Sequence, residues 1–154
     1  MLKLDKSYII NGGTDVVVRL RNELMEPDAL INIKEIKSLH EIIEEEESIT
    51  VGACVTMNEM AHHKAVIHDF GILVDAVHYA GSGQVRNLAT MAGNICNASP
   101  LADSATPLLV YDAKVLVYSP NGDREIPITE FFKGVRKIAL EKGEIVTGLS
   151  LIHI

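Results

Sequence analysis

Residues 8–20 read YIINGGTDVVVRL, and this stretch decides the fold expected for the first part of the chain. Tyr8–Ile10 is short, apolar and β-prone, which predicts a strand, and the run from Val16 predicts the start of a helix. The two glycines between them can adopt positive φ in a tight turn without a steric penalty. Thr14 or Asp15 is expected to cap the helix by accepting a hydrogen bond from a backbone N–H.

The rest of the chain predicts an α+β fold. A second strand at Leu30–Ile33 completes a βαβ unit, so the first lobe is expected to hold parallel strands. Thr56 and Glu59 have the spacing of a capping box, which places a helix start at Met57. Further helices are expected at about 69–79, ending at the glycines that follow, and from Pro107, and Thr129 could cap one more helical turn. Strands are expected at 40–46, 48–55, 114–119, 124–128 and 144–154.

Composition favours a soluble globular protein of 154 residues, with 47% apolar and 23% charged residues. The net charge of −7 and the scattered basic residues argue against a nucleic-acid partner. No apolar run reaches the roughly 20 residues of a membrane span, and the N-terminus lacks a signal-peptide pattern, so a cytoplasmic location is expected. Cys54 and Cys96 are far apart and predict neither a zinc site nor an iron–sulfur cluster.

A second candidate site lies at residues 88–107, which read LATMAGNICNASPLADSATP. Small side chains leave the backbone bare, so Thr90–Asn94 is interpreted as a second glycine-containing loop, in which amide groups converge on an anion. Neither loop matches the dinucleotide fingerprint G-x-G-x-x-G or a Walker A loop. Together they predict a clamp for a diphosphate, with Asn94, Asn97 and Asp103 as hydrogen-bonding groups.

Purely structural roles remain open as alternatives for these residues. The two asparagines are also compatible with a polar turn, and Asp103 or Ser104 with the N-cap of a helix. The six histidines show no metal-ligand pattern, and no serine lies in a nucleophile elbow. We therefore expect no catalytic side chain and no metal, so any chemistry would be that of a cofactor.

Five segments carry a resemblance to a known family: GGTDVV, ITVGACVTMNEM, GSGQVRNLATMAGNICNASPLADSATPLLVYDAKVLV, GDREIPITEFF and EIVTGLSL. They resemble the FAD-binding medium subunit of the molybdenum hydroxylases, of the xanthine dehydrogenase and carbon monoxide dehydrogenase type. The resemblance runs from about Ile9 to the end of the chain. It implies the vanillyl-alcohol-oxidase (PCMH) type of FAD-binding domain, with a small parallel βαβ lobe at 1–36 and a larger lobe with an antiparallel sheet at 37–154.

The same resemblance implies which residues contact FAD. The first and second loops would hold the diphosphate of the cofactor. Two further residues would lie near its ribityl or adenosine part, and two apolar residues would approach it. In that order they are Ile10, Asn11, Gly12, Gly13, Thr14, Asp15 and Val16; Ala89, Thr90, Gly93, Asn94, Cys96 and Asn97; Ala102 and Asp103; and Val85 and Val146.

Two departures from the family pattern are expected to matter. Ala92 replaces the first of two paired glycines, which is tolerable only if its φ is negative; otherwise the cost is about 1–2 kcal/mol. The chain is also shorter than family members at both ends, and the C-terminal family domain is expected to be absent.

The resemblance implies an oxidoreductase subunit that carries electrons. It would take them from 2Fe-2S clusters of a partner subunit, in a complex with a molybdopterin-binding large subunit, and pass them through FAD to NAD or another acceptor. The alternative is a cofactor-free assembly module that retains the same fold.

Overall fold

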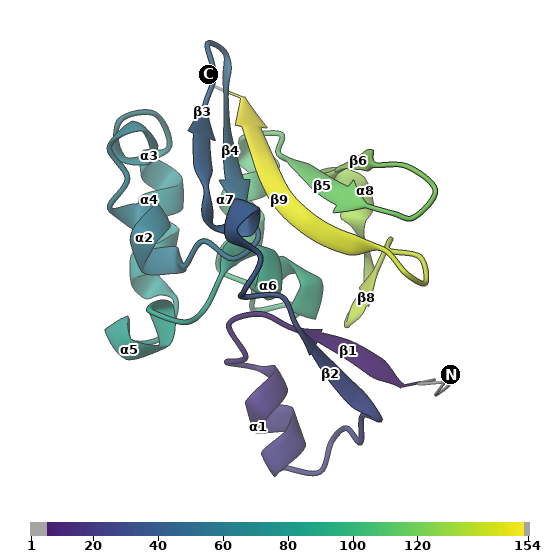
Figure 1. Ribbon diagram of the computed structural model, residues 1–154. Helices are drawn as coiled ribbons and strands as arrows, with labels where there is room; N and C mark the ends of the chain where they lie inside the picture. The colour runs from purple at the N-terminus through teal and green to yellow at the C-terminus, as the bar shows by residue number, and fades with distance from the viewer. Residues whose placement is uncertain (1–5, 153–154) are drawn as a thin grey trace.

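The computed structural model describes residues 6–152 and divides into a small lobe and a larger lobe (Figure 1). In the small lobe, strand β1 (Ser7–Ile10) pairs in parallel with β2 (Ala29–Asn32), and helix α1 (Val16–Arg21) connects them. This is the predicted βαβ unit, with the second strand starting one residue earlier than expected. Asp15 is the N-cap residue of α1, but its side chain forms no capping hydrogen bond, so the predicted side-chain cap is wrong.

The larger lobe is built on a five-stranded antiparallel sheet with strand order β3-β4-β9-β5-β6. The central strand β9 (Ile145–Ile152) pairs with β4 on one side and with β5 on the other. Strands β7 and β8, which come after β6 and α8 in the chain, form a separate two-stranded antiparallel sheet. The remaining bounds are β3 Ile42–Glu44, β4 Ser48–Gly52, β5 Lys114–Tyr118, β6 Arg124–Pro127, β7 Phe132–Gly134 and β8 Lys137–Ile138. The end of the last predicted strand, 153–154, lies outside the described residues.

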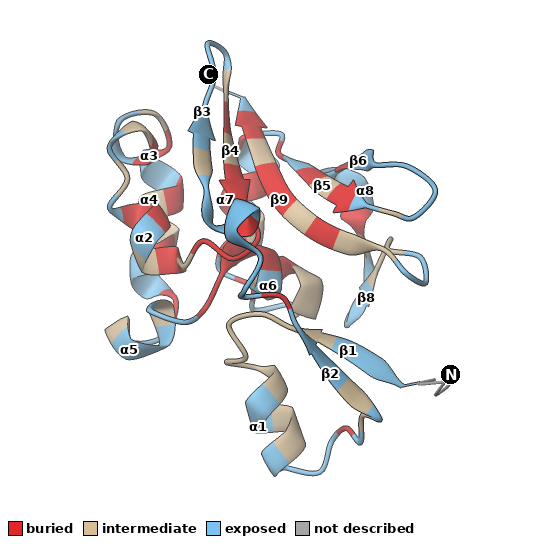
Figure 2. Ribbon diagram, in the orientation of Figure 1, coloured by how far each residue is buried: buried red, intermediate tan, exposed pale blue. Residues whose placement is uncertain are grey.

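Short helices share one hydrophobic core with the sheet (Figure 2). Alternate residues of β9, such as Leu149 and Leu151, are buried against the helices, as the two-residue period of a strand requires. Phe70 packs edge-on against Tyr111, with ring centroids 5.0 Å apart. The helices and the 3-10 turn η1 are η1 Lys37–His40, α2 Met57–Ala61, α3 Lys64–Asp69, α4 Gly71–Tyr79, α5 Gly83–Arg86, α6 Met91–Asn97, α7 Ala105–Val110 and α8 Ile128–Phe131.

Capping residues and local backbone conformation account for the observed ends of the predicted helices. The capping box is confirmed: Thr56 accepts from the Glu59 N–H and the Glu59 carboxylate accepts from the Thr56 N–H. The helix expected at about 69–79 is confirmed as α4, which begins at Gly71. An additional helix, α3, ends at Asp69, and Phe70 separates the two with φ −126° and ψ 44°. Ser82 caps an additional helix, α5, immediately after the predicted stop.

Two proline-flanked helices begin earlier than expected. Pro107 lies inside the first turn of α7, which starts at Ala105, and a proline is tolerated there because the first N–H groups of a helix have no intrahelical acceptor. Pro127, rather than Thr129, is the N-cap residue of α8.

The longest described helix, α4, has nine residues. None of the described helices has the length and apolar character needed to cross a membrane.

Candidate functional site

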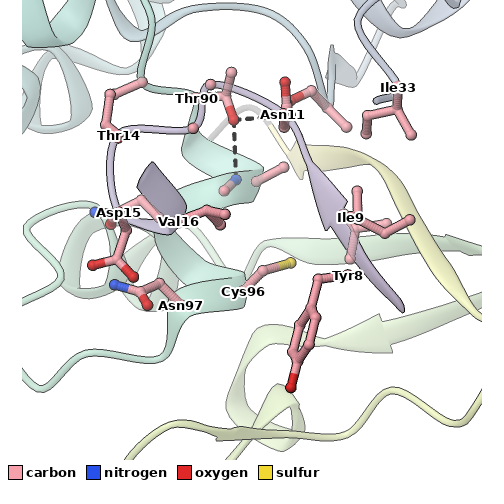
Figure 3. A pocket seen from close by; sticks show the side chains of 18 of the residues that line it. Tyr8, Ile9, Asn11, Thr14, Asp15, Val16, Ile33, Thr90, Cys96 and Asn97 are labelled. Carbon is pink, nitrogen blue, oxygen red and sulfur yellow. Dashed lines mark hydrogen bonds between the residues drawn. The ribbon is translucent and has the colours of Figure 1, made fainter. Parts of the chain in front are cut away.

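A cavity of about 500 Å³ opens between the two lobes and is lined by both of them (Figure 3). The turn after β1 forms one wall, helix α6 forms the facing wall, and the segment leading into β9 closes one end. Thr14 and Asn94 both line it, so the two predicted loops meet at one site. Its volume is in the range of about 300–1,000 Å³ that is typical of small-molecule and cofactor sites.

The first wall is a backbone turn with free amide groups. Gly13 has φ +73°, which a residue with a side chain adopts only at a cost. Gly12 lies so close to the next segment that an added Cβ would be 2.0 Å from the Leu88 carbonyl oxygen. The amide N–H groups of 12–16 donate no hydrogen bond to any described part of the chain. These consecutive free N–H groups belong to residues that line the cavity, and such a row of donors is suited to an anion.

The second wall is helix α6, and the prediction of a loop at Thr90–Asn94 is therefore wrong. Thr90 is the N-cap: its Oγ1 accepts from the Gly93 N–H at 3.0 Å. Ala98 ends the helix in the left-handed conformation, with φ +46°. Ala92 lies within the helix and is not among the described residues of positive φ, so the alanine in place of a glycine causes no backbone strain.

Side chains join the two walls directly. The Asn11 amide nitrogen donates to Thr90 Oγ1 at 3.1 Å and to the Ala53 carbonyl at 2.5 Å. On the other side of the turn, Arg136 Nη1 lies 3.4 Å from Asp15 Oδ2 and also donates to the side-chain and backbone oxygens of Asn97. The turn is thus fixed to both ends of α6.

An apolar wall closes the end of the cavity near β9. A bidentate ion pair orders it: Arg124 Nε and Nη2 each lie 2.7 Å from an oxygen of Glu144, and Nη2 also donates to the Ala139 carbonyl. The hydrogen bond from Arg124, followed by that from the Glu141 N–H, lowers the pKa of the Glu144 carboxyl to about 2. The apolar residues of this wall are Ile138, Leu140, Ile145 and Val146.

Cys96 also lines the cavity, and burial raises the pKa of its thiol to about 12. At neutral pH the thiol is therefore protonated and a poor nucleophile. It contributes a small, weakly polar surface to the second wall.

Most predicted site residues line this cavity. Ile10 does not line it, and its side chain lies against the turn instead, 3.4 Å from the position of a Cβ built on Gly13. Ala102 and Asp103 do not, because the left-handed Ala98 turns the chain away from the cavity. The predicted residues that line it are Asn11, Gly12, Gly13, Thr14, Asp15, Val16, Val85, Ala89, Thr90, Gly93, Asn94, Cys96, Asn97 and Val146.

The alternatives for the polar residues are partly resolved. Ser104 is the N-cap residue of α7 but makes no side-chain capping bond; its hydroxyl instead donates to Asn94 Oδ1 at 2.6 Å. Asn94 and Asn97 belong to α6 and not to a turn. Asp103 is exposed.

Sequence reasoning missed several lining residues. Arg19 follows Asp15 by four positions, and that helical spacing places both on one face, so it could have been found. Tyr8 and Ile9 extend the predicted turn backwards. Ala92 lies within the predicted stretch Thr90–Asn94 and lines the cavity with it. The others are brought to the cavity by long-range packing, for which no local signal exists; they are Met25, Ile33, Ala53, Ile138, Leu140, Glu144 and Ile145.

Comparison with known proteins gives this cavity a context. Residues 2–151 match the model of the family "FAD binding domain in molybdopterin dehydrogenase". The chain belongs to this family. The family assignment and FAD as the family's cofactor, both expected from the sequence, are confirmed.

Individual relatives agree. The chain is 37% identical over 142 residues to the nicotinate dehydrogenase FAD-subunit of Eubacterium barkeri, covering 90% of this chain and 48% of that protein. It is 35% identical over 142 residues to the xanthine dehydrogenase FAD-binding subunit of Escherichia coli O157:H7, covering 92% and 49%. The chain thus spans about half the length of these curated relatives.

Solved structures confirm the predicted fold class. The carbon monoxide dehydrogenase of Hydrogenophaga pseudoflava superimposes with a TM-score of 0.93 at 26% identity, over 96% of this chain and 52% of that chain. Quinoline 2-oxidoreductase from Pseudomonas putida 86 superimposes with the same score, identity and coverage.

Proposed function

We propose that this chain binds FAD in the cavity between the glycine turn and α6, clasped by the two lobes 1–36 and 37–154. The observation that carries the proposal is the row of free amide groups at 12–16, which faces a helix start across a cavity of cofactor size. Backbone N–H groups converging from a glycine turn are a common way to hold a diphosphate.

The residues present fit such a ligand. Thr90 Oγ1 already accepts two hydrogen bonds, from Asn11 and Gly93, so both of its lone pairs are used. Its own proton has no acceptor among the described residues and is available to a phosphate oxygen. Asn97, held by Arg136, is a further polar group on this wall.

The apolar end of the cavity suits a ring system of the cofactor. Leu140, Ile145 and Val146 offer hydrophobic surface, and aromatic rings gain from being buried against such side chains. When bound, FAD supplies the electron-carrying chemistry, while the protein supplies binding, orientation and the local charge. No side chain of the chain is needed as an acid or base.

We further propose a role in a larger enzyme. The nicotinate, xanthine and carbon monoxide dehydrogenase relatives support an oxidoreductase complex, in which this chain would meet a subunit with 2Fe-2S clusters and a molybdopterin-binding large subunit. Its flavin would take electrons from those clusters and pass them to NAD or another acceptor. Binding and reduction of the flavin in the purified cytoplasmic complex would test this role.

FAD titration tests the binding proposal. Protein at micromolar concentration is expected to quench flavin fluorescence with saturation at one FAD per chain, and the purified protein is expected to be yellow. Riboflavin, which lacks the diphosphate, serves as the comparison and should bind more weakly. Absence of quenching would support the cofactor-free assembly module instead.

A further inference from the structure

The charged residues that line the cavity differ in whether they have an ion-pair partner. In the described part of the chain they are Asp15, Arg19 and Glu144. Each carboxylate is paired with an arginine that does not line the cavity: Arg136 lies 3.4 Å from Asp15, and Arg124 lies 2.7 Å from Glu144. The cation on the wall has no such partner.

Arg19 is placed on α1, one helical turn beyond the free amides of the glycine turn. It is half-buried, and its guanidinium forms neither an ion pair nor a hydrogen bond with any residue the structure describes. Acidic residues stand four positions away on either side, where helical ion pairs normally form. Asp15 is engaged by Arg136, and Glu23 lies past the helix end with φ +55° and forms no ion pair within residues 6–152.

A half-buried arginine without an ion pair or hydrogen bond adds little to the stability of the fold. Partial burial removes water from a guanidinium, and the loss is compensated only when an anion or hydrogen-bond acceptor replaces that water. The protein as a whole carries a net charge of −7, so acidic partners for Arg19 are not scarce. Arg19 nevertheless lines the cavity without one.

We propose that Arg19 is a specificity-determining residue that binds the diphosphate of the dinucleotide through its guanidinium. This inference rests on the proposed function, because it assigns the anion to the same cofactor. The backbone amides of 12–16 supply neutral donors, and Arg19 adds the positive charge that distinguishes a diphosphate ligand from an uncharged one. Arginine suits this role because its fork of N–H groups matches phosphate oxygens.

The test compares FAD and riboflavin binding by fluorescence quenching in three variants. R19Q is expected to weaken FAD binding about tenfold, as for loss of one hydrogen bond to a charged group. R19K should retain part of the affinity, since it keeps the charge but not the fork. The matched control is R21Q, which removes the same charge from the exposed last turn of α1 and should change the affinity less than about twofold.

Measurements with riboflavin and with the wild-type protein distinguish an error in the role of Arg19 from an error in the proposed FAD binding. The affinity for riboflavin should be equal in the wild type and in R19Q, and the salt dependence of FAD binding should be shallower in R19Q. Equal losses of FAD affinity in R19Q and R21Q, or a parallel loss of riboflavin binding in R19Q, would overturn the role of Arg19 alone. Failure of the wild-type protein to bind FAD would overturn both this inference and the proposed function.

Discussion

Asn11 and Thr90, which are 79 positions apart in the chain, are joined by a hydrogen bond of 3.1 Å from the Asn11 amide nitrogen to the Thr90 hydroxyl oxygen. The same oxygen caps α6 by accepting from the Gly93 N–H. One hydroxyl group therefore sets the start of the helix and its distance from the glycine turn. These hydrogen bonds fix the two cavity walls relative to each other, and the same Thr90 hydroxyl would also contact the ligand.

Replacing Thr90 with valine should affect both stability and binding. T90V keeps the shape of the side chain but removes the cap and the acceptor for Asn11, so we expect the free energy of unfolding to fall by about 1–2 kcal/mol. FAD affinity should fall as well, since the hydroxyl donor is lost. Urea unfolding and fluorescence titration measure the two effects. The control is T129V, because Thr129 is exposed and its hydroxyl makes no hydrogen bond to any residue that the structure describes; a similar loss there would contradict the capping role.

Gly93 offers a test of ligand approach that leaves the backbone intact. It lies in α6 with ordinary helical geometry, so alanine should change the unfolding free energy by less than about 1 kcal/mol. Its new Cβ would lie 3.0 Å from Thr90 Oγ1, and both residues line the cavity. We therefore expect G93A to reduce FAD affinity about tenfold, equivalent to one lost charged hydrogen bond.

The matched control for G93A is G71A. Gly71 begins α4, and an added Cβ there meets no atom within 4 Å. This variant should bind FAD as the wild type does. If G93A also binds FAD normally, the proposed position of the diphosphate against the start of α6 is wrong.

The sequence predicts the turn better than it predicts the cavity. The glycine turn after β1 was predictable because strand, glycines and helix are contiguous, and the required positive φ of Gly13 is a local property. Helix α6 was misread as a loop because its small residues give no apolar period, and its length of seven residues depends on the Thr90 cap and on burial of Ile95.

At the apolar end of the cavity only Val146 was expected, and that from the family resemblance; the rest could not have been predicted from the local pattern. Ile138 and Leu140 reach it only because Arg124, in β6, holds the following loop through Glu144 and the Ala139 carbonyl. That contact spans 20 positions and depends on the pairing of β5 with both β6 and β9. Nothing in the local pattern marks Glu144 as different from the other glutamates.

Arg136 should matter for binding more than for stability. Its pair with Asp15 is partly exposed, so R136Q should change the unfolding free energy by less than about 1 kcal/mol. Without it the Asp15 carboxylate faces the cavity uncompensated and repels a diphosphate, and we expect FAD affinity to fall roughly fivefold, about 1 kcal/mol. Adding D15N should restore most of the affinity. A double variant as weak as R136Q would show that charge compensation is not the cause.

The ion pair between Glu144 and Arg124 predicts a specific dependence of stability on pH. The hydrogen bonds from Arg124 and from the Glu141 N–H lower the pKa of Glu144 from 4.5 to about 2 in the folded protein. A carboxyl whose pKa is lower when folded stabilises the protein above its unfolded pKa and loses this contribution as the pH falls. E144Q should therefore be less stable than the wild type at neutral pH. The gap, measured by urea unfolding at a series of pH values, should close as the pH falls from about 4.5 to about 2.

The control for E144Q is E130Q, because Glu130 is an exposed glutamate that forms no ion pair in the described part of the chain. Its difference from the wild type should stay small and show no trend over the same pH range. The side chain of Glu144, by contrast, is only 6% exposed, and Arg124 contacts both of its oxygens. A gap between E144Q and the wild type that persists unchanged at pH 2 would mean that glutamine disturbs the packing of the loop, and that the ionised pair is not what orders the wall.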